Sequence, residues 1–269
     1  MCSRVPRSSC GEQVSPAEAL TAIAIGFGAG ILSGMFGVGG GIVMTPAIQI
    51  ALGTAPIVSL ATPLPAIFPT AIAGALRYRR AGELDLPAAA RLAAGGVPAA
   101  ILGAGLTDVV ATQLLLLVTA GLLGWQALGV MRGRTPSGEP AEVSAKPAAF
   151  VLVGVLAGLV SGLLGIGGGI VMVPLMVGRL GVPLKRALGT SLAAIVLMVV
   201  PGSIVHAALG NVDWPTCVAL AIGAVPGARV GSHIALGTAE RRLRSMVGGS
   251  MLVIALAYGL RQLFEYLGS

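Results

Sequence analysis

The chain has 269 residues, of which 55% are hydrophobic and 10% are charged, and its mean hydropathy is +0.93. This composition excludes a soluble globular domain, whose surface would need far more charge, and the continuous apolar runs of about 20 residues, long enough to cross a bilayer as helices, exclude the alternating pattern of a transmembrane β-barrel. The formal net charge is +7, but the Lys and Arg residues lie between the apolar runs, which indicates loops that set membrane topology and no nucleic-acid partner.

We therefore predict an all-α polytopic membrane protein with two groups of five helical segments. In the first group the segments span residues 16–36, 41–52, 57–78, 86–106 and 112–131. In the second group they span residues 149–164, 169–180, 184–207, 214–236 and 242–260. A polar linker, residues 132–147, joins a first repeat at 16–131 to a second at 148–262, with tails at 1–15 and 263–269.

The two groups are an internal duplication. Gly30 aligns with Gly158, an offset of 158 − 30 = 128 residues. The offset holds without a gap over roughly 80 residues, with about 30 identities, which indicates a repeated structural unit. It also pairs Asp85 with Asp213, each of which precedes a helix in the form D-x-P and is predicted to cap that helix.

The positively charged loops indicate that the two repeats are inverted. In the first repeat the basic loop follows the third segment and carries Arg77, Arg79 and Arg80. In the second repeat the basic loops follow the second and fourth segments, with Arg179, Lys185, Arg186, Arg241 and Arg242. Because basic loops remain cytoplasmic, equivalent loops lie on opposite sides. The linker is then cytoplasmic, and both termini are expected on the periplasmic side of a bacterial inner membrane.

A glycine-rich phrase interrupts each repeat: GMFGVGGGIVMTPAI at 34–48 and GLLGIGGGIVMVPLM at 162–176. Non-helical backbone at membrane depth is tolerated only where protein buries it or where it lines a wet cavity. Paired broken helices in inverted repeats are typical of secondary transporters. The short helix after each break directs the positive end of its dipole into the break, which favours an anion. The break glycines predicted to bind substrate are Gly37, Gly39, Gly40, Gly41, Gly165, Gly167, Gly168 and Gly169.

Glycine can also serve helix packing or chain flexibility, and each of these roles predicts a different spacing. Close helix packing is the favoured role for the glycines at four-residue spacing, which are Gly26, Gly30, Gly34, Gly154, Gly158 and Gly162. A flexible hinge is compatible with a binding role. A dinucleotide-binding loop is disfavoured because no strand precedes the phrase and no acidic partner follows it.

Several polar side chains are candidates for substrate contact, with structural roles left open. Hydroxyls that could bond a ligand or their own helix carbonyls belong to Ser33, Thr62, Ser161, Thr190 and Ser191. Arg229 is a charge inside a membrane segment, with anion coordination and a structural role as alternatives. His206 and Asn211 are expected at the membrane interface. The cysteines and histidines show no metal-ligand spacing, so no metal, no cofactor and no enzymatic activity are predicted.

The doubled phrase S-G-x-x-G-x-G-G-G-x-x-x-x-P, at 33–46 and 161–174, resembles the TauE/SafE sulfite-exporter family of membrane permeases. The segments VPLKRALGTS at 182–191 and GARVG at 227–231 are also similar to that family. The resemblance covers residues 21–258 and implies transport of sulfite, sulfonates or related organosulfur anions. The first repeat departs from the pattern, because Pro63 stands where the second repeat has Ser191. If the Ser191 hydroxyl binds substrate, Pro63 cannot do the same, because proline has no hydroxyl.

These observations together predict a secondary transporter that moves a small anion, sulfite or an organosulfonate, by alternating access. A proton or another ion is a candidate for coupling, and a homo-oligomer is compatible with the sequence. The alternatives are an anion channel and, in a different class, an intramembrane enzyme or assembly factor.

Overall fold

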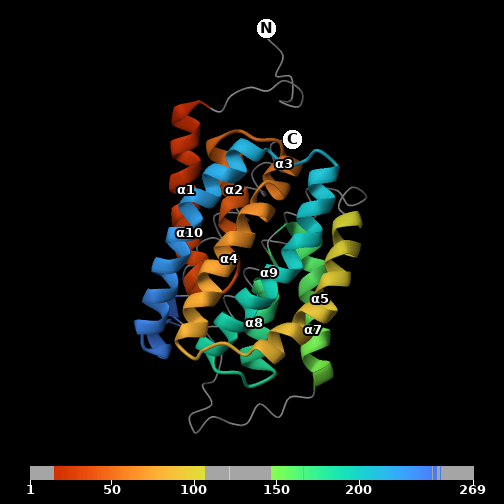
Figure 1. The fold of residues 1–269 in the computed structure, drawn as a ribbon, viewed down its shortest axis with the longest axis vertical. Coiled ribbons are helices and arrows are strands. Elements are labelled where there is room, and N and C mark those ends of the chain that lie inside the picture. Colours follow the sequence, from red (N-terminus) through yellow and green to blue (C-terminus); the bar gives the residue numbers. More distant parts are fainter. Residues whose placement is uncertain are drawn as a thin grey trace.

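The computed structural model describes residues 15–106, 147–165 and 167–243, together with positions 121, 245, 246 and 249. Every labelled element in these residues is an α-helix (Figure 1), which confirms the all-α expectation. The first repeat contains α1 (Pro16–Phe36), α2 (Gly41–Ala51), α3 (Pro56–Ala61), α4 (Pro63–Arg80) and α5 (Leu86–Leu106). The second contains α7 (Pro147–Leu164), α8 (Gly169–Gly178), α9 (Leu184–Ala208) and α10 (Trp214–Gly237). The predicted segments 112–131 and 242–260, the linker and the tails lie almost wholly outside the described residues.

Helix length separates the described elements into two kinds. Five spans are long and apolar enough to cross a membrane: α1, α3 with α4, α5, α9 and α10. By contrast α2 has 11 residues and α8 has 10, which at 1.5 Å per residue gives about 15–17 Å of helix. These two helices are too short to cross a bilayer alone, as the sequence predicted.

The predicted third segment of the first repeat is one apolar span, Pro56–Arg80, but it is not an uninterrupted helix. It is divided at Thr62, which ends α3 and precedes α4. The cause is Pro63, the first residue of α4, because proline has no N–H to continue the hydrogen-bond ladder. In the second repeat Ser191 stands at this position, and α9 runs unbroken over Leu184–Ala208.

Two helix pairs are held in backbone contact by glycine stripes. A Cβ added at Gly30 would clash with the carbonyl oxygen of Ala224, and one added at Gly158 would clash with that of Gly96. The same holds at every other glycine in this set: Gly26, Gly34, Gly154 and Gly162. The absence of side chains therefore lets α1 lie directly on α10, and α5 on α7. The packing role predicted for these six glycines is confirmed.

The pairing exchanges helices between the repeats. Each of these close pairs joins the first segment of one repeat to the fourth segment of the other, and Figure 1 shows α1 beside α10 and α5 beside α7. A Cβ on Gly74 would lie 2.8 Å from Leu192, whereas one on Gly202 would lie 3.9 Å from Leu64. A later residue of α4 therefore contacts an earlier residue of α9, so these two repeat mates are antiparallel. Their orientation relative to a bilayer stays a prediction.

The end of α4, the start of α9 and the end of α10 lie at the lower end of the bundle in Figure 1. There a guanidinium nitrogen of Arg77 lies 2.7 Å from Nδ1 of His233. The Nζ of Lys185 donates a 2.8 Å hydrogen bond to the carbonyl of Leu236. The end of α4, the start of α9 and the end of α10 therefore meet. Assignment of this end to the cytoplasm stays a prediction.

Two hydrogen bonds across the repeats fix the loops that precede α5 and α10. The Oγ1 of Thr190 accepts from the backbone N–H of Asp85 at 3.1 Å, and the Oγ1 of Thr62 accepts from that of Asp213 at 3.1 Å. Asp85 caps α5 as predicted, since its Oδ1 accepts from the N–H of Ala88 at 2.9 Å. Asp213 is at the N-cap of α10, but its carboxylate accepts from the hydroxyl of Thr216 at 2.6 Å instead of a backbone N–H.

The glycine stripe generates a first prediction. Gly30→Ala should lower the free energy of unfolding by about 1–3 kcal/mol, because the added methyl group overpacks a backbone contact. Gly28 lies on the same helix with nothing within 4 Å of an added Cβ, so Gly28→Ala is the matched control and should leave stability unchanged or slightly raised. Thermal unfolding in detergent measures both, and equal melting temperatures would contradict the packing role.

The cross-repeat hydrogen bonds generate a second prediction. Thr62→Val and Thr190→Val should each lower the free energy of unfolding by about 1 kcal/mol, because each removes the acceptor for a loop N–H. Thr21→Val is the control, since that hydroxyl bonds only its own helix at an exposed position. If all three variants have the same melting temperature, the loops do not depend on these hydrogen bonds.

Candidate functional site

Each glycine phrase forms a short non-helical break between two helices. Residues 37–40 separate α1 from α2, and Gly165, Gly167 and Gly168 lie between α7 and α8. The backbone has positive φ at Gly37 (67°), Gly39 (86°) and Gly40 (85°). The repeat mates Gly165, Gly167 and Gly168 have φ values of 65°, 89° and 75°. Because L residues with side chains rarely adopt such angles, the phrase requires glycine at these positions.

The two breaks lie against each other. A Cβ on Gly169 would clash with the carbonyl oxygen of Gly37 and would lie 2.7 Å from the Cα of Val38. A Cβ on Gly167 would lie 3.5 Å from the carbonyl oxygen of Val38. All eight glycines predicted to bind substrate, Gly37, Gly39, Gly40, Gly41, Gly165, Gly167, Gly168 and Gly169, are buried. Tertiary structure thus brings together two phrases that are 128 residues apart.

The short helices begin within the breaks. In α2 the N–H groups of Val43 and Met44 donate to the carbonyl of Gly40, each at 3.1 Å. In α8 the N–H groups of Val171 and Met172 donate to that of Gly168, at 3.1 and 3.2 Å. The N–H groups before these have no acceptor within their own helix and form the positive end of its dipole. Each break therefore offers backbone donors of the kind that bind anions.

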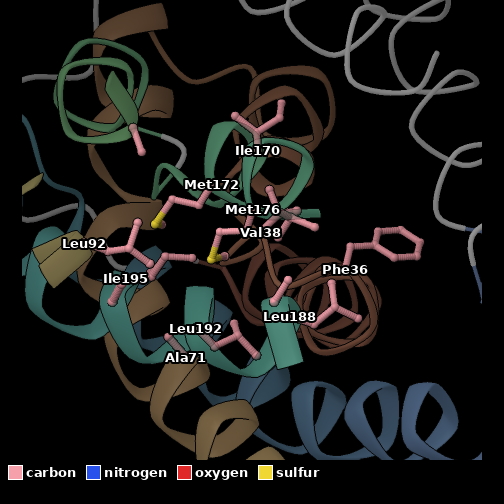
Figure 2. Packing of buried hydrophobic residues seen from close by; sticks show 14 of the residues in the cluster. Phe36, Val38, Ala71, Leu92, Ile170, Met172, Met176, Leu188, Leu192 and Ile195 are labelled. Carbon is pink, nitrogen blue, oxygen red and sulfur yellow. The ribbon is translucent and has the colours of Figure 1, made fainter. Parts of the chain in front are cut away.

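Apolar side chains surround the breaks (Figure 2). Val38 stands between Gly37 and Gly39 in the first break and is 2% exposed. It belongs to a buried cluster with α4, α5, α8 and α9, whose labelled members are Phe36, Val38, Ala71, Leu92, Ile170, Met172, Met176, Leu188, Leu192 and Ile195. This cluster keeps the breaks away from water and lowers the local dielectric, so any charge bound there interacts strongly with the helix ends.

Ser191 ties the first break to α9. Its Oγ lies 2.8 Å from the carbonyl oxygen of Gly37 and 2.9 Å from that of Leu188, so its one hydroxyl hydrogen is shared between them. The repeat mate Pro63 has no hydroxyl, and Gly165 of the second break lies against the carbonyl of Leu60. The two breaks are therefore held differently. Thr62 and Thr190 do not face the breaks in this way, because their hydroxyls bond the loops described above.

Two hydroxyls near the first break have no hydrogen-bond partner within the described residues: the Oγ of Ser33 and the Oγ1 of Thr45. Ser33 is 1% exposed and Thr45 is 4% exposed. Leaving a buried hydroxyl unpaired costs about 1–3 kcal/mol. Ser161, the repeat mate of Ser33, is also buried. The sequence did not single out Thr45, although Val173 at the equivalent position was an available signal.

Arg229 is not brought to the breaks. Its side chain is on the exposed outer face of α10, whereas the adjacent Ala228 packs against Gly34. No Arg or Lys side chain is buried in the part of the chain that the structure describes. The donors at the breaks are therefore neutral hydroxyls and backbone N–H groups.

A buried aromatic pair was missed by the sequence analysis. Tyr78 is fully buried, and its hydroxyl donates a 2.9 Å hydrogen bond to the carbonyl of Gly34, one turn before the first break. Its repeat mate His206 is in the last turn of α9 and is 1% exposed, so protein covers it, while its depth relative to a membrane stays a prediction. The alignment of two polar ring side chains at one repeat position was the signal that could have placed them inside.

The comparisons with known proteins agree with this architecture. The model of the family described as "Sulfite exporter TauE/SafE" matches residues 22–258. The "Probable membrane transporter protein YunE" of Bacillus subtilis is 26% identical over 267 residues, covering 90% of this chain and 96% of the relative. A "Probable membrane transporter protein" of Xylella fastidiosa is 29% identical over 238 residues, covering 87% and 89%. No solved structure matches the chain significantly. Because the family model spans nearly the whole chain, this protein belongs to the sulfite exporter TauE/SafE family of membrane transporters.

Proposed function

We propose that the protein is a secondary transporter that moves a small anion, sulfite or an organosulfonate, across the bacterial inner membrane by alternating access. The observation that carries this proposal is the contact between the two glycine breaks, where Gly169 meets Gly37. Two short helices begin at this contact, and each contributes the positive end of its dipole, equivalent to about half an elementary charge. The substrate class follows from these anion-binding ends together with the family description.

Binding, and not bond cleavage, is the chemistry that these groups support. Among the described residues, the polar side chains nearest the breaks carry hydroxyls, as in Ser33 and Ser191, and the other polar atoms there are backbone amides and carbonyls. Such groups replace the hydration shell of an anion without reacting with it. This favours a transporter over the intramembrane enzyme or assembly factor considered from the sequence. The coupling ion, which the sequence left as a proton or another ion, stays unassigned.

The helix pairing suggests which parts move. The α1–α10 and α5–α7 pairs make backbone contact through glycine, so separating them would disrupt tight packing along whole helices. Along the middle of α4 and α9 the contact is made by side chains such as Leu64 and Leu192, which can slide. At the start of α9, Gly189 lies against the carbonyl of Glu83. We therefore place the alternating motion at α4 and α9, between two bodies that each combine helices from both repeats, and not between one intact repeat and the other.

Counterflow in proteoliposomes tests the transport proposal. Vesicles loaded with unlabelled sulfite should accumulate labelled sulfite, with saturation and a requirement for substrate on the opposite side. Sulfonates should compete, and a non-sulfur anion such as acetate should compete poorly. A linear current that follows voltage without countertransport would indicate a channel. If no anion moves at all, the proposed function is wrong.

The contact between the breaks generates a second test. Gly169→Ala should reduce counterflow by about fivefold or more, because the methyl group would displace Gly37, and an overpacking cost of about 1–3 kcal/mol corresponds to that factor. Gly178→Ala, in the same short helix with nothing within 4 Å of the new Cβ, is the matched control. Both variants should insert and remain monodisperse in detergent. If Gly169→Ala shows undiminished counterflow, the contact between the two breaks is not needed for transport.

A further inference from the structure

The two breaks share a backbone design but differ in the side chains that surround them. Three hydroxyl-bearing residues of the first repeat have counterparts 128 residues later, and only one of these counterparts has a hydroxyl. Ser33 corresponds to Ser161, but Thr45 corresponds to Val173 and Thr70 to Met198. All six side chains are buried. The two repeats therefore share the glycines of the breaks but differ in the polarity of the side chains at these equivalent positions.

The second break is closed by an apolar side chain. The Cε of Met198 would lie 3.1 Å from a Cβ on Gly168, the N-cap residue of α8. The Sδ of Met198 would lie 2.6 Å from a Cβ on Gly96, so the thioether also fills the space beside α5. At the equivalent place in α4 the first repeat has the shorter Thr70, whose hydroxyl is bonded to the carbonyl of Ala66 at 2.7 Å.

The first break carries unpaired polar groups. Ser33 lies against Gly40, the N-cap of α2, because its Cβ and the carbonyl oxygen of Ala29 would each lie 3.3 Å from a Cβ on that glycine, with the Cε of Met44 at 3.4 Å. The Ser33 and Thr45 hydroxyls are almost fully buried and have no partner among the described residues. Unpaired buried hydroxyls are rare. One of these two lies beside the N-cap of α2 and the other is on the fifth residue of that helix. Together with the free N–H groups at the start of α2, they point to a ligand.

We propose that the first break is the polar part of the substrate site and that the second break is its apolar wall. The hydroxyls of Ser33 and Thr45 and the first N–H groups of α2 bind the oxygen atoms of an oxyanion. Met198 and Val173 add no side-chain donor on the opposite side, where the start of α8 contributes only its backbone N–H groups. This assignment rests on the proposed transport function and adds the location of the anion within the paired breaks.

The same groups define the charge of the substrate. The described part of the chain has no buried Arg or Lys, and hydroxyls donate hydrogen bonds without carrying net charge. The two helix ends together contribute about one positive charge. One negative charge is thus balanced, whereas a second would be buried without compensation. The site therefore takes a singly charged oxyanion, such as a sulfonate or hydrogen sulfite, and rejects a dianion.

The test measures counterflow of labelled methanesulfonate, a permanent monoanion, by purified protein in proteoliposomes. Ser33→Ala and Thr45→Val should each raise its KM by about fivefold, the effect of one lost hydrogen bond, whereas Thr45→Ser should retain the wild-type KM. Ser232→Ala removes a buried hydroxyl that already bonds the carbonyl of Arg229 and serves as the control with unchanged KM. Unlabelled sulfate, a dianion, should not compete with methanesulfonate.

Distinct results would overturn distinct parts of this assignment. If Ser161→Ala raises the KM as much as Ser33→Ala does, the two breaks share the substrate and the polar site is not at the first one. If Ser33→Ala and Thr45→Val leave the KM unchanged while the wild type transports, these hydroxyls do not bind it. Competition by sulfate equal to that by unlabelled methanesulfonate would contradict the charge assignment. Absence of counterflow with every anion in the wild type would instead refute the transport function itself.

Discussion

The constraint on which the structure depends is that non-helical backbone within a membrane must be buried in protein, because lipid offers no hydrogen-bond partners. The chain breaks its helices twice, between α1 and α2 and between α7 and α8. It meets the constraint by packing one break against the other, so that Gly169 covers the carbonyl of Gly37. Ser191 supplies a further hydrogen bond to that carbonyl. The element that would destabilise each repeat alone is thus shielded by its counterpart.

Glycine serves a second purpose in the long helices. The stripes on α1 and α7 bring these helices into backbone contact with α10 and α5, so each repeat is closed by a helix of the other. This exchange explains why the two breaks are held at the same place, since both close glycine pairs among the described helices join one repeat to the other. It also limits the motions available to a transporter, because tightly packed pairs shift as units while contacts between side chains can slide.

A duplicated backbone with diverged side chains gives the protein both its symmetry and its asymmetry. The cross-repeat bonds of Thr62 and Thr190 are equivalent under the repeat offset and have the same length, 3.1 Å. Pro63 and Ser191 occupy one repeat position with opposite consequences, since proline divides the helix and serine ties it to the break. A transported anion experiences this asymmetry, because helix ends supply similar fields at both breaks and only side chains distinguish them.

The sequence by itself determined the helical class, the duplication, the two breaks and the helix bounds 16–36 and 86–106, because run length, glycine spacing and internal identity are properties of the chain alone. It also predicted the packing glycines from their spacing. Only the tertiary structure decided which polar groups meet: Arg229 is on an outer face, the hydroxyls of Thr62 and Thr190 bond loops, His206 is buried, and Ser33 and Thr45 are left unpaired. The physical reason is that a helix apolar on all sides carries no periodic pattern to indicate its inner face. Which face a serine or arginine occupies then depends on partners more than 100 residues away.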